Sequence, residues 1–255
     1  MTSRKTDIAV VTSCSLKGWE QYAKHCIPSL LQYWPSDVTI HLVSEDILPL
    51  GNLPVLAKGR LTTWSLNSSL HDRAFREKYK YDQRARGRQR GYSYLMDAWK
   101  FSKKVFAIDL VAINLARGRL IWLDADVQTF KEIPRELLIK LCPDNCHVSF
   151  LARKKMHSEC GFVGYNLNSP ETFRFIGNFA RCYSSGDVFN LKEWHDSYVF
   201  DWLRRNTFSV NGYEIAHTNG AHPFNYSELG EYMDHWKGNR KQHQHSRDHP
   251  RFKKR

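Results

Sequence analysis

The sequence predicts a single-domain α/β protein with a mostly parallel sheet and flanking helices. Strand-like and helix-like segments alternate along the chain, a short strand near its middle is apolar at every position, and two aspartates follow that strand directly. Alternation of this kind is typical of parallel strands joined by helices. At 255 residues the chain has the length of one large domain, and its 25% of charged residues is ordinary for a folded protein.

The first unit of this sheet lies in the N-terminal part of the chain. Residues 7–12 form an apolar run of strand length, residues 19–34 are compatible with a helix, and residues 38–43 form a second strand-like run. Strand, helix and strand within about 35 residues predict two parallel strands with a covering helix. Residues 50–91 interrupt this pattern with Pro, Gly, Asn and Ser, and we expect an irregular, basic excursion over the edge of the sheet.

The central part of the chain carries the strongest signals. Apolar residues recur on one helical face between Leu95 and Phe106, with the three lysines of this stretch mostly off that face. Residues 120–123 are apolar throughout, which predicts a central strand buried on both faces. Further strands and helices are expected, in order, at residues 148–151, 161–166, 170–183 and 193–204.

The net charge of +12 is concentrated in two segments. Residues 73–90 contribute +6 and residues 237–255 contribute +7, so the rest of the chain is close to neutral. Segments of this kind favour a polyanionic partner such as nucleic acid, or the phosphate groups of a substrate. Alternatively, both segments are solvated and serve solubility alone. We expect residues 237–255 to form a basic, His-rich tail behind a domain that spans residues 1–236.

Nothing in the sequence predicts export or a membrane span. No apolar stretch approaches the 18 residues of a membrane helix, and the N-terminus runs into the first strand without the apolar core of a signal peptide. We therefore expect a cytoplasmic protein whose six cysteines are reduced. Cys142 and Cys146 lie close together, but no second pair of Cys or His completes a zinc site, so a plain loop is favoured.

Asp124 and Asp126 form the only Asp-x-Asp pair of the chain, and they stand where the central strand ends. In a regular strand, residues i and i+2 face the same side, so the two carboxylates can converge on one cation. Mg²⁺ and Mn²⁺ accept one or two carboxylates and fill their other positions with water and phosphate oxygens. A departing nucleoside diphosphate needs such a cation to neutralise its charge. A surface turn with two solvated aspartates would give the same pattern.

Five segments together resemble a known family. Residues 99–108 and 120–126 look like the helix and the metal-binding strand of GT-A-fold glycosyltransferases. Residues 159–166 are similar to the glycine-led strand that lines the sugar site in glycosyltransferase family 8. Residues 193–197 stand where that family has an acidic motif that contacts the donor sugar, and residues 235–241 fit its closing H-x-x-G-x-x-K pattern.

The resemblance implies a GT-A (Rossmann-like) fold and the metal-dependent transfer of a hexosyl or pentosyl group from a nucleotide-sugar, with a UDP-sugar expected, to an acceptor hydroxyl. It assigns the divalent metal, Mn²⁺ or Mg²⁺, to Asp124, Asp126 and His235, and assigns contacts with the diphosphate to Gly238 and Lys241. It also implies that Asp124 touches the nucleotide and that the reaction retains the anomeric configuration. The Pro-Trp pair that follows this lysine in the family is absent here.

Two more acidic residues are candidates for catalysis. The resemblance places Asp196 at the hydroxyls of the donor sugar, although this residue also fits the start of a helix, where the dipole stabilises an acid. Glu159 would orient the acceptor or stabilise an oxocarbenium-like transition state, unless it is a solvated residue at a strand edge. The remaining candidates for nucleotide binding follow the first two strands: Thr12, Ser13 and Asp46.

The nature of the acceptor is predicted from charge and aromatic content. Aromatic residues interleave the first basic segment, as stacking on bases would require, so a hydroxymethylated DNA base is one candidate acceptor. A cell-surface glycan, a lipid-linked group or a protein is the alternative. A non-catalytic nucleic-acid-binding α/β protein would also explain the charge, but it leaves Asp124 and Asp126 unexplained. A nucleotidyltransferase is disfavoured, because residues 12–18 match a Gly-rich, Lys/Arg-bearing signature loop poorly.

Overall fold

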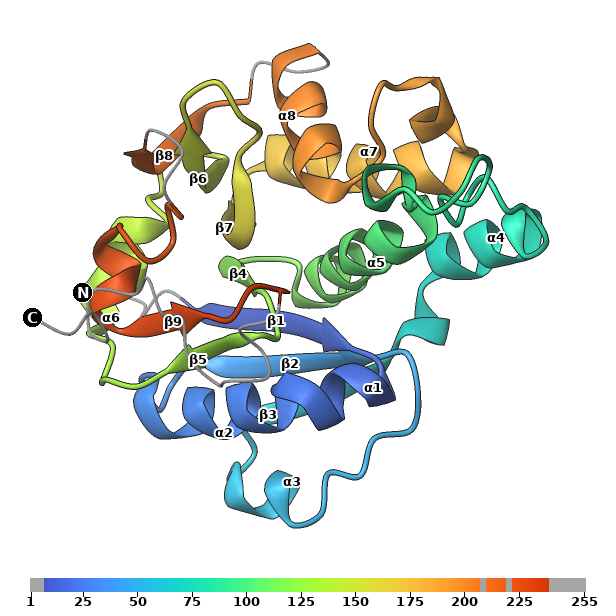
Figure 1. Cartoon of the computed structure of the whole chain (residues 1–255). Helices are drawn as coiled ribbons and strands as arrows, with labels where there is room; N and C mark the ends of the chain where they lie inside the picture. Colours follow the sequence, from blue (N-terminus) through green and yellow to red (C-terminus); the bar gives the residue numbers. More distant parts are fainter. Residues whose placement is uncertain (1–6, 207–209, 219–221, 239–255) are drawn as a thin grey trace, which may run out of the picture.

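The computed structural model describes residues 7–206, 210–218 and 222–238. Within them, seven strands form one sheet in the order β3-β2-β1-β4-β7-β6-β8 (Figure 1). The strands are β1 (Ile8–Cys14), β2 (Thr39–Ser44), β3 (Leu61–Ser65), β4 (Arg119–Leu123), β6 (Val148–Arg153), β7 (Glu159–Asn166) and β8 (Gly212–Thr218). The strands β3, β2, β1 and β4 are neighbours in the sheet and run parallel to one another, and β6 is parallel to β8. Between these two groups, β7 is antiparallel to both of its neighbours, β4 and β6. The predicted mostly parallel α/β sheet is therefore confirmed.

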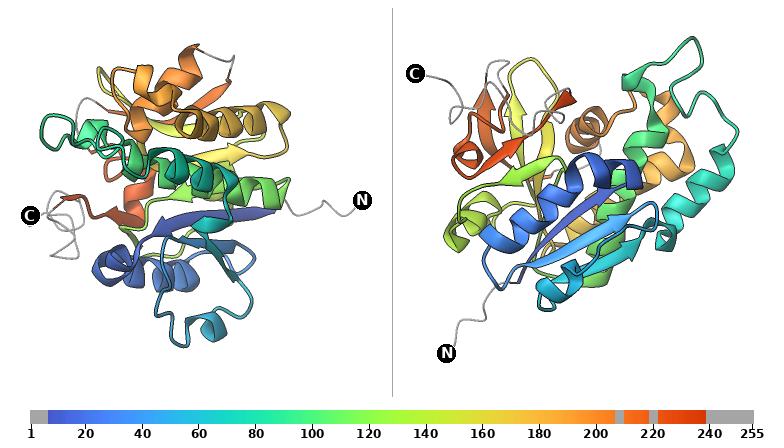
Figure 2. Two further views of the ribbon diagram at one scale, coloured as in Figure 1. Left: turned by 90° about the vertical axis from the view of Figure 1, so that its right-hand side faces the viewer. Right: turned by 60° about the horizontal axis from the view of Figure 1, so that its bottom comes forward.

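Helices cover both faces of this sheet (Figure 2). One face packs against α4 (Leu70–Tyr79), α5 (Ala98–Leu115), α7 (Pro170–Ser185) and α8 (Asp196–Asn206). The other packs against the π-helical turn η1 (Trp19–Ala23), which follows α1 (Leu16–Gly18), and against α2 (Lys24–Tyr33) and α6 (Arg135–Leu141). The side chains of Ser69, Asp97 and Ser169 accept hydrogen bonds from first-turn backbone N–H groups of α4, α5 and α7, and so fix where these helices begin.

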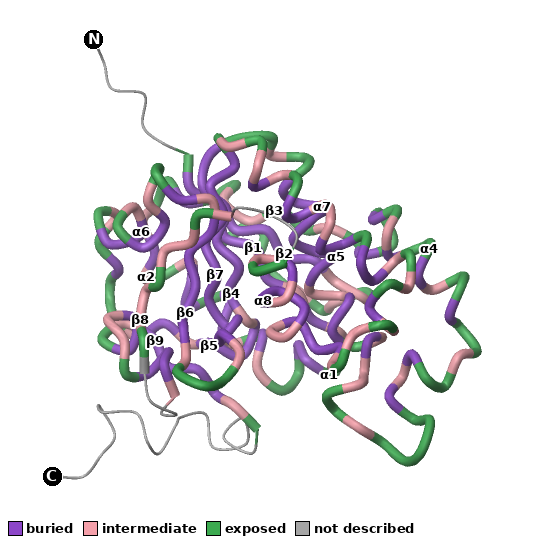
Figure 3. The backbone as a smooth tube through the Cα atoms, turned by 90° about the horizontal axis from the view of Figure 1, so that it is seen from above, coloured by how far each residue is buried: buried purple, intermediate pink, exposed green. Residues whose placement is uncertain are grey.

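The central strand β4 is buried along its whole length, as its apolar sequence predicts. Leu120 and Trp122 pack into the core on one face of the sheet, and Ile121 and Leu123 pack into the core on the other. Because successive side chains of a strand point to opposite faces, the sheet separates two hydrophobic cores. Figure 3 shows the central strands buried, with exposed residues gathered in the outer connections and along α4.

A second, two-stranded sheet connects the last described segment to the end of β4. β5 (Val127–Thr129) follows β4 after a short turn and pairs antiparallel with β9 (Met233–His235). The 3₁₀ turn η5 (Glu228–Glu231) leads into β9. Residues more than a hundred positions apart in the sequence therefore lie side by side near the carboxyl end of the central strand.

Residues 50–91, which we expected to be irregular, contain regular elements. They hold α3 (Leu53–Leu56), the edge strand β3, the 3₁₀ turn η2 (Leu66–Ser68) and α4, which packs against α5 and α7. β3 is half-exposed, and α4 buries only Asp72, Phe75 and Tyr79, so neither element shows a strong apolar period. The 3₁₀ turns η3 (Tyr94–Met96) and η4 (Asp187–Asn190) complete the elements of the described residues.

Three expectations about the chain as a whole can be compared with the structure. All six cysteines are free and buried. None of the described helices combines the length and the apolar character that crossing a bilayer requires. The predicted basic tail starts at residue 237, and its residues 239–255 lie outside the described part of the chain.

Candidate active site

A cavity of about 1240 Å³ lies at the carboxyl ends of β1 and β4. The start of β7, the N-terminal half of α5, the start of α8 and the residues after β9 also form its walls. Parts of residues 83–97, the β6–β7 connection and the segment before α8 line it as well. Open α/β sheets bind ligands at this edge, because their loops gather there. The volume exceeds the roughly 300–1,000 Å³ of a typical ligand pocket, so the cavity has room for more than one bound group.

Asp124, Asp126 and His235 converge in one wall of this cavity, and we call them the Asp-His cluster. His235 Nε2 lies 3.0 Å from Asp126 Oδ1 and 3.5 Å from Asp124 Oδ2. One possible ligand atom from each residue lies within 4.8 Å of the other two. The side chain of His235 is 1% exposed, whereas that of Asp124 is 29% exposed and lines the cavity. Two carboxylates and an imidazole, with an open side for water or phosphate, fit Mn²⁺ chemically.

A turn, rather than the strand, orients the two aspartates. β4 ends at Leu123, and the aspartates belong to the turn that leads into β5. The backbone N–H of Asp124 donates to the carbonyl of Gly161, and the N–H of Trp236 donates to the carbonyl of Asp126, both at 2.9 Å. The carboxylates do come together. The reason expected from the sequence, the two-residue period of a regular strand, was wrong because the strand has already ended.

The small β5–β9 sheet brings His235 to the aspartates. His235 stands directly opposite Val127, the residue that follows Asp126. Gly161 in β7 lies against the imidazole, since a Cβ built on this glycine would be 2.5 Å from His235 Cε1 and 2.7 Å from its Nδ1. Real Cβ atoms do not come within 3.0 Å of a neighbouring heavy atom, so only glycine fits without displacing the ring.

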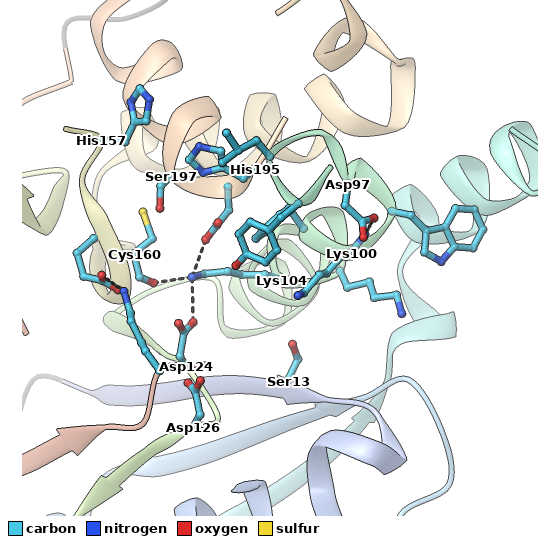
Figure 4. A pocket seen from close by; sticks show the side chains of 18 of the residues that line it. Ser13, Asp97, Lys100, Lys104, Asp124, Asp126, His157, Cys160, His195 and Ser197 are labelled. Carbon is cyan, nitrogen blue, oxygen red and sulfur yellow. Dashed lines mark hydrogen bonds and ion pairs between the residues drawn. The ribbon is translucent and has the colours of Figure 1, made fainter. Parts of the chain in front are cut away.

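Lys104 in α5 links the Asp-His cluster to Asp196 at the start of α8. Its Nζ lies 3.0 Å from Asp124 Oδ1 and 2.8 Å from Asp196 Oδ2, and it donates to the carbonyl of Cys160 (Figure 4). Burial alone would lower the pKa of Lys104, but Asp124 and Asp196 raise it well above its ordinary value. The protein therefore places a permanent positive charge between two of its acidic groups.

Glu159 is buried beside His235 and is not a solvated residue at a strand edge. Its side chain is 4% exposed, its Oε1 accepts a 3.0 Å hydrogen bond from the N–H of Gly161, and its Oε2 pairs with Lys237. Burial alone would raise the pKa of Glu159, but Lys237 and His235 outweigh it and hold the pKa at about 2. At neutral pH this carboxylate stays ionised and is a poor general base.

Some of the other residues expected to bind the donor line the cavity, and others do not. Asp196 is buried at the first position of α8 and also lines the cavity, so both interpretations of this residue fit its position. Ser13 lines the cavity as well, and so does Gly238. Thr12 is fully buried within β1. Asp46 accepts a 2.8 Å hydrogen bond from the backbone N–H that begins α1, and it lines a separate pocket of about 330 Å³.

The last binding candidate, Lys241, lies outside the described residues.

Three residues of the cavity wall contact the carboxylates of the site but were not among the candidates from the sequence: Lys104, Trp122 and Lys237. Lys104 stands three residues after Phe101 and four before Ile108, which are both buried, so helical spacing places it near the buried side of α5. That spacing could have identified it. Trp122 Nε1 donates to Asp124 Oδ1 at 2.7 Å, and the ammonium of Lys104 lies 4.9 Å from the centre of the Trp122 ring.

No family model matches the sequence, and no curated protein matches it either. Among solved structures, the apo form of the glycosyltransferase GlyE of Streptococcus pneumoniae TIGR4 matches with a TM-score of 0.53 and 14% identity, over 82% of this chain and 45% of that chain. The apo structure of the bifunctional glycosyltransferase WbbM matches with a TM-score of 0.51 and 11% identity, over 93% and 47%.

This likeness concerns the fold, which is of the GT-A type, and it does not single out family 8. The chain spans slightly less than half the length of either structure.

The close approach of Gly161 to His235 gives a test of the cluster. We expect Gly161→Ala to lower the affinity for Mn²⁺ by about tenfold or more, because the added Cβ displaces a buried imidazole. Gly177→Ala in α7 is the matched control, since a Cβ there meets no heavy atom within 4 Å. Free Mn²⁺ can be counted by electron paramagnetic resonance, with circular dichroism to verify folding. A folded Gly161→Ala variant with unchanged Mn²⁺ affinity would contradict the assignment.

Proposed function

We propose that this protein transfers a sugar from a nucleotide-diphosphate donor to an acceptor hydroxyl with the help of a divalent metal. The observation that carries the proposal is the convergence of Asp124, Asp126 and His235 in a cavity that also contains Lys104 and Asp196. A fold shared with solved glycosyltransferases supports it.

The Asp-His cluster would hold the metal, and Gly238 would lie beside the donor's diphosphate. Mn²⁺ or Mg²⁺ bound there would offset the charge that develops on the leaving phosphate. Gly238 has a φ of +59° and lines the cavity, so its backbone can approach a phosphate without a Cβ in the way. The neighbouring Lys237 adds positive charge, although it is paired with Glu159.

The sugar of the donor would lie beside Asp196. This carboxylate lies 2.8 Å from the ammonium of Lys104 and lines the cavity, and carboxylate oxygens accept strong hydrogen bonds from hydroxyl groups. Lys104 also sets the spacing between Asp196 and Asp124, so that a sugar held by one is aligned with a diphosphate held at the other. We propose a UDP-sugar, with its base near Ser13 and Glu45 at the ends of β1 and β2.

Replacing either aspartate should abolish most of the activity. We expect Asp124→Asn and Asp126→Asn each to reduce Mn²⁺-dependent hydrolysis of the donor by about 100-fold or more, since a metal's contribution of several kcal/mol corresponds to at least two powers of ten. Asp187→Asn, an exposed aspartate in η4, is the control. The assay screens a panel of nucleotide sugars. Full activity of the wild-type chain in excess EDTA is the result that would refute a metal-dependent reaction.

Basic and aromatic side chains along the cavity favour an anionic acceptor. Arg88 and Lys155 are exposed and line it from the segment before α5 and from the β6–β7 connection. The guanidinium of Arg86 lies 3.8 Å from the centre of the Trp99 ring, and the ammonium of Lys100 lies 4.5 Å from that of Tyr94. Cations interleaved with aromatic rings suit phosphates flanked by bases, so a modified DNA base is the acceptor that we propose to test first.

Binding of DNA should depend steeply on salt. We expect a DNA duplex to bind in low salt and to be released as the salt concentration rises, because Lys and Arg displace counterions from phosphates. Arg88→Ala with Lys155→Ala should reduce the slope of log affinity against log salt by about 1–2, as measured by fluorescence anisotropy. Absence of binding at low ionic strength favours an uncharged glycan or protein acceptor. DNA binding without any binding of nucleotide sugars would instead identify a non-catalytic nucleic-acid-binding protein.

A further inference from the structure

A second group of potential metal ligands lines the same cavity and shares no residue with the Asp-His cluster. His157 belongs to the connection between β6 and β7, and Glu193 and His195 belong to the segment before α8. Both histidines direct Nε2 toward one carboxylate oxygen, since Glu193 Oε2 lies 3.4 Å from His157 Nε2 and 2.8 Å from His195 Nε2. In Figure 4, His157 and His195 lie near the start of α8, on the far side of Lys104 from Asp126.

We propose that His157, Glu193 and His195 bind a second divalent cation of the zinc class. Two imidazole nitrogens and one carboxylate oxygen form a donor set that Zn²⁺ binds well, whereas Mg²⁺ prefers oxygen ligands. This cation site is distinct from the one that holds the metal in the proposed transfer reaction, and its existence does not depend on that reaction.

Two of the three separations between ligand atoms are close to those of a tetrahedral zinc site, and all three are within 4.8 Å. Bonds of about 2.0–2.1 Å from zinc to its ligands place the ligand atoms about 3.3–3.4 Å apart. The separation of 3.4 Å between His157 and Glu193 already has this value. The separation of 2.8 Å between His195 and Glu193 must widen by about 0.6 Å, which small side-chain rotations allow.

The surrounding side chains hold the two imidazoles in place and leave one side open. The ring centre of His157 lies 5.0 Å from that of Tyr198, and the ring centre of His195 lies 5.9 Å from that of Phe101. The exposed fractions of the three side chains are 35% for His157, 22% for Glu193 and 11% for His195. Since all three line the cavity, a water molecule or a group of a substrate can complete the coordination.

When zinc binds, coordination of both side chains replaces the hydrogen bond between His195 and Glu193, and one further hydrogen bond of His195 is given up. His195 Nδ1 accepts from the backbone N–H of Tyr198 at 3.4 Å, so without a metal the ring proton lies on Nε2 and is donated to Glu193. Coordination through Nε2 moves this proton to Nδ1. The contact that is lost is longer than the usual range of about 2.7–3.2 Å and is therefore weak.

The test measures Zn²⁺ affinity of the full chain, freed of metal, by competition with a chromogenic chelator at pH 7.5. The sequence holds three further histidines in its C-terminal segment, so every sample carries His243→Ala, His245→Ala and His249→Ala. In this background we expect His157→Ala and Glu193→Gln each to weaken Zn²⁺ binding by about 100-fold. His217→Ala is the matched control, because His217 pairs with Glu214 on the surface at 3.0 Å but belongs to no three-residue group within the described part of the chain.

The outcomes separate the two cation sites. Retention of Zn²⁺ binding in Asp124→Asn with Asp126→Asn, together with its loss in His157→Ala and Glu193→Gln, supports the second site. Unchanged affinity in His157→Ala and Glu193→Gln, loss in the aspartate variant alone, or no measurable Zn²⁺ binding overturns it. No nucleotide sugar and no transfer activity enter the measurement, so its result is independent of the proposed function.

Discussion

Negative charge concentrated at the carboxyl end of β4 is the constraint on which the rest of the site depends. Two aspartates of the turn after this strand, one glutamate of β7 and one aspartate of α8 line a single cavity: Asp124, Asp126, Glu159 and Asp196. Carboxylates gathered in this way raise one another's pKa unless positive charge offsets them. Lys104 and Lys237 supply such charge from within the chain, each bound to particular carboxylates. The Asp-His cluster is where an external cation would complete the balance.

The fold assembles this charge balance from segments that are far apart in the sequence. α5 supplies Lys104 and β9 supplies His235. β7 packs against the imidazole of His235 at Gly161, where the absence of a side chain allows the close approach. Backbone hydrogen bonds from Asp124 to β7 and from Trp236 to the aspartate turn lock the parts together. A diphosphate and its sugar would then extend from the cluster toward α8. In the proposed reaction, the preformed charges would orient such a donor without reorganisation at the moment of reaction.

Much of this architecture could be predicted from the sequence, because β4 and the helices around it bury continuous apolar faces. The elements at the edge of the fold, β3 and α4, were not predicted, because they bury few side chains and their apolar periodicity is weak. The meeting of Asp126 with His235 was expected only through a family resemblance, because pairing between β5 and β9 spans over a hundred residues and leaves no local pattern. Lys104 was overlooked because a charged residue in a helix is usually solvent-exposed.

We propose above all that the Asp-His cluster holds a divalent metal that binds the donor's diphosphate. Isothermal titration calorimetry with UDP-sugars, in Mn²⁺ and in EDTA, tests it most directly. We expect one UDP-sugar to bind far more tightly with Mn²⁺ present, and the same nucleotide sugar to tighten Mn²⁺ binding by an equal factor, as linkage requires. Equal affinity for the nucleotide sugar in Mn²⁺ and in EDTA would contradict it.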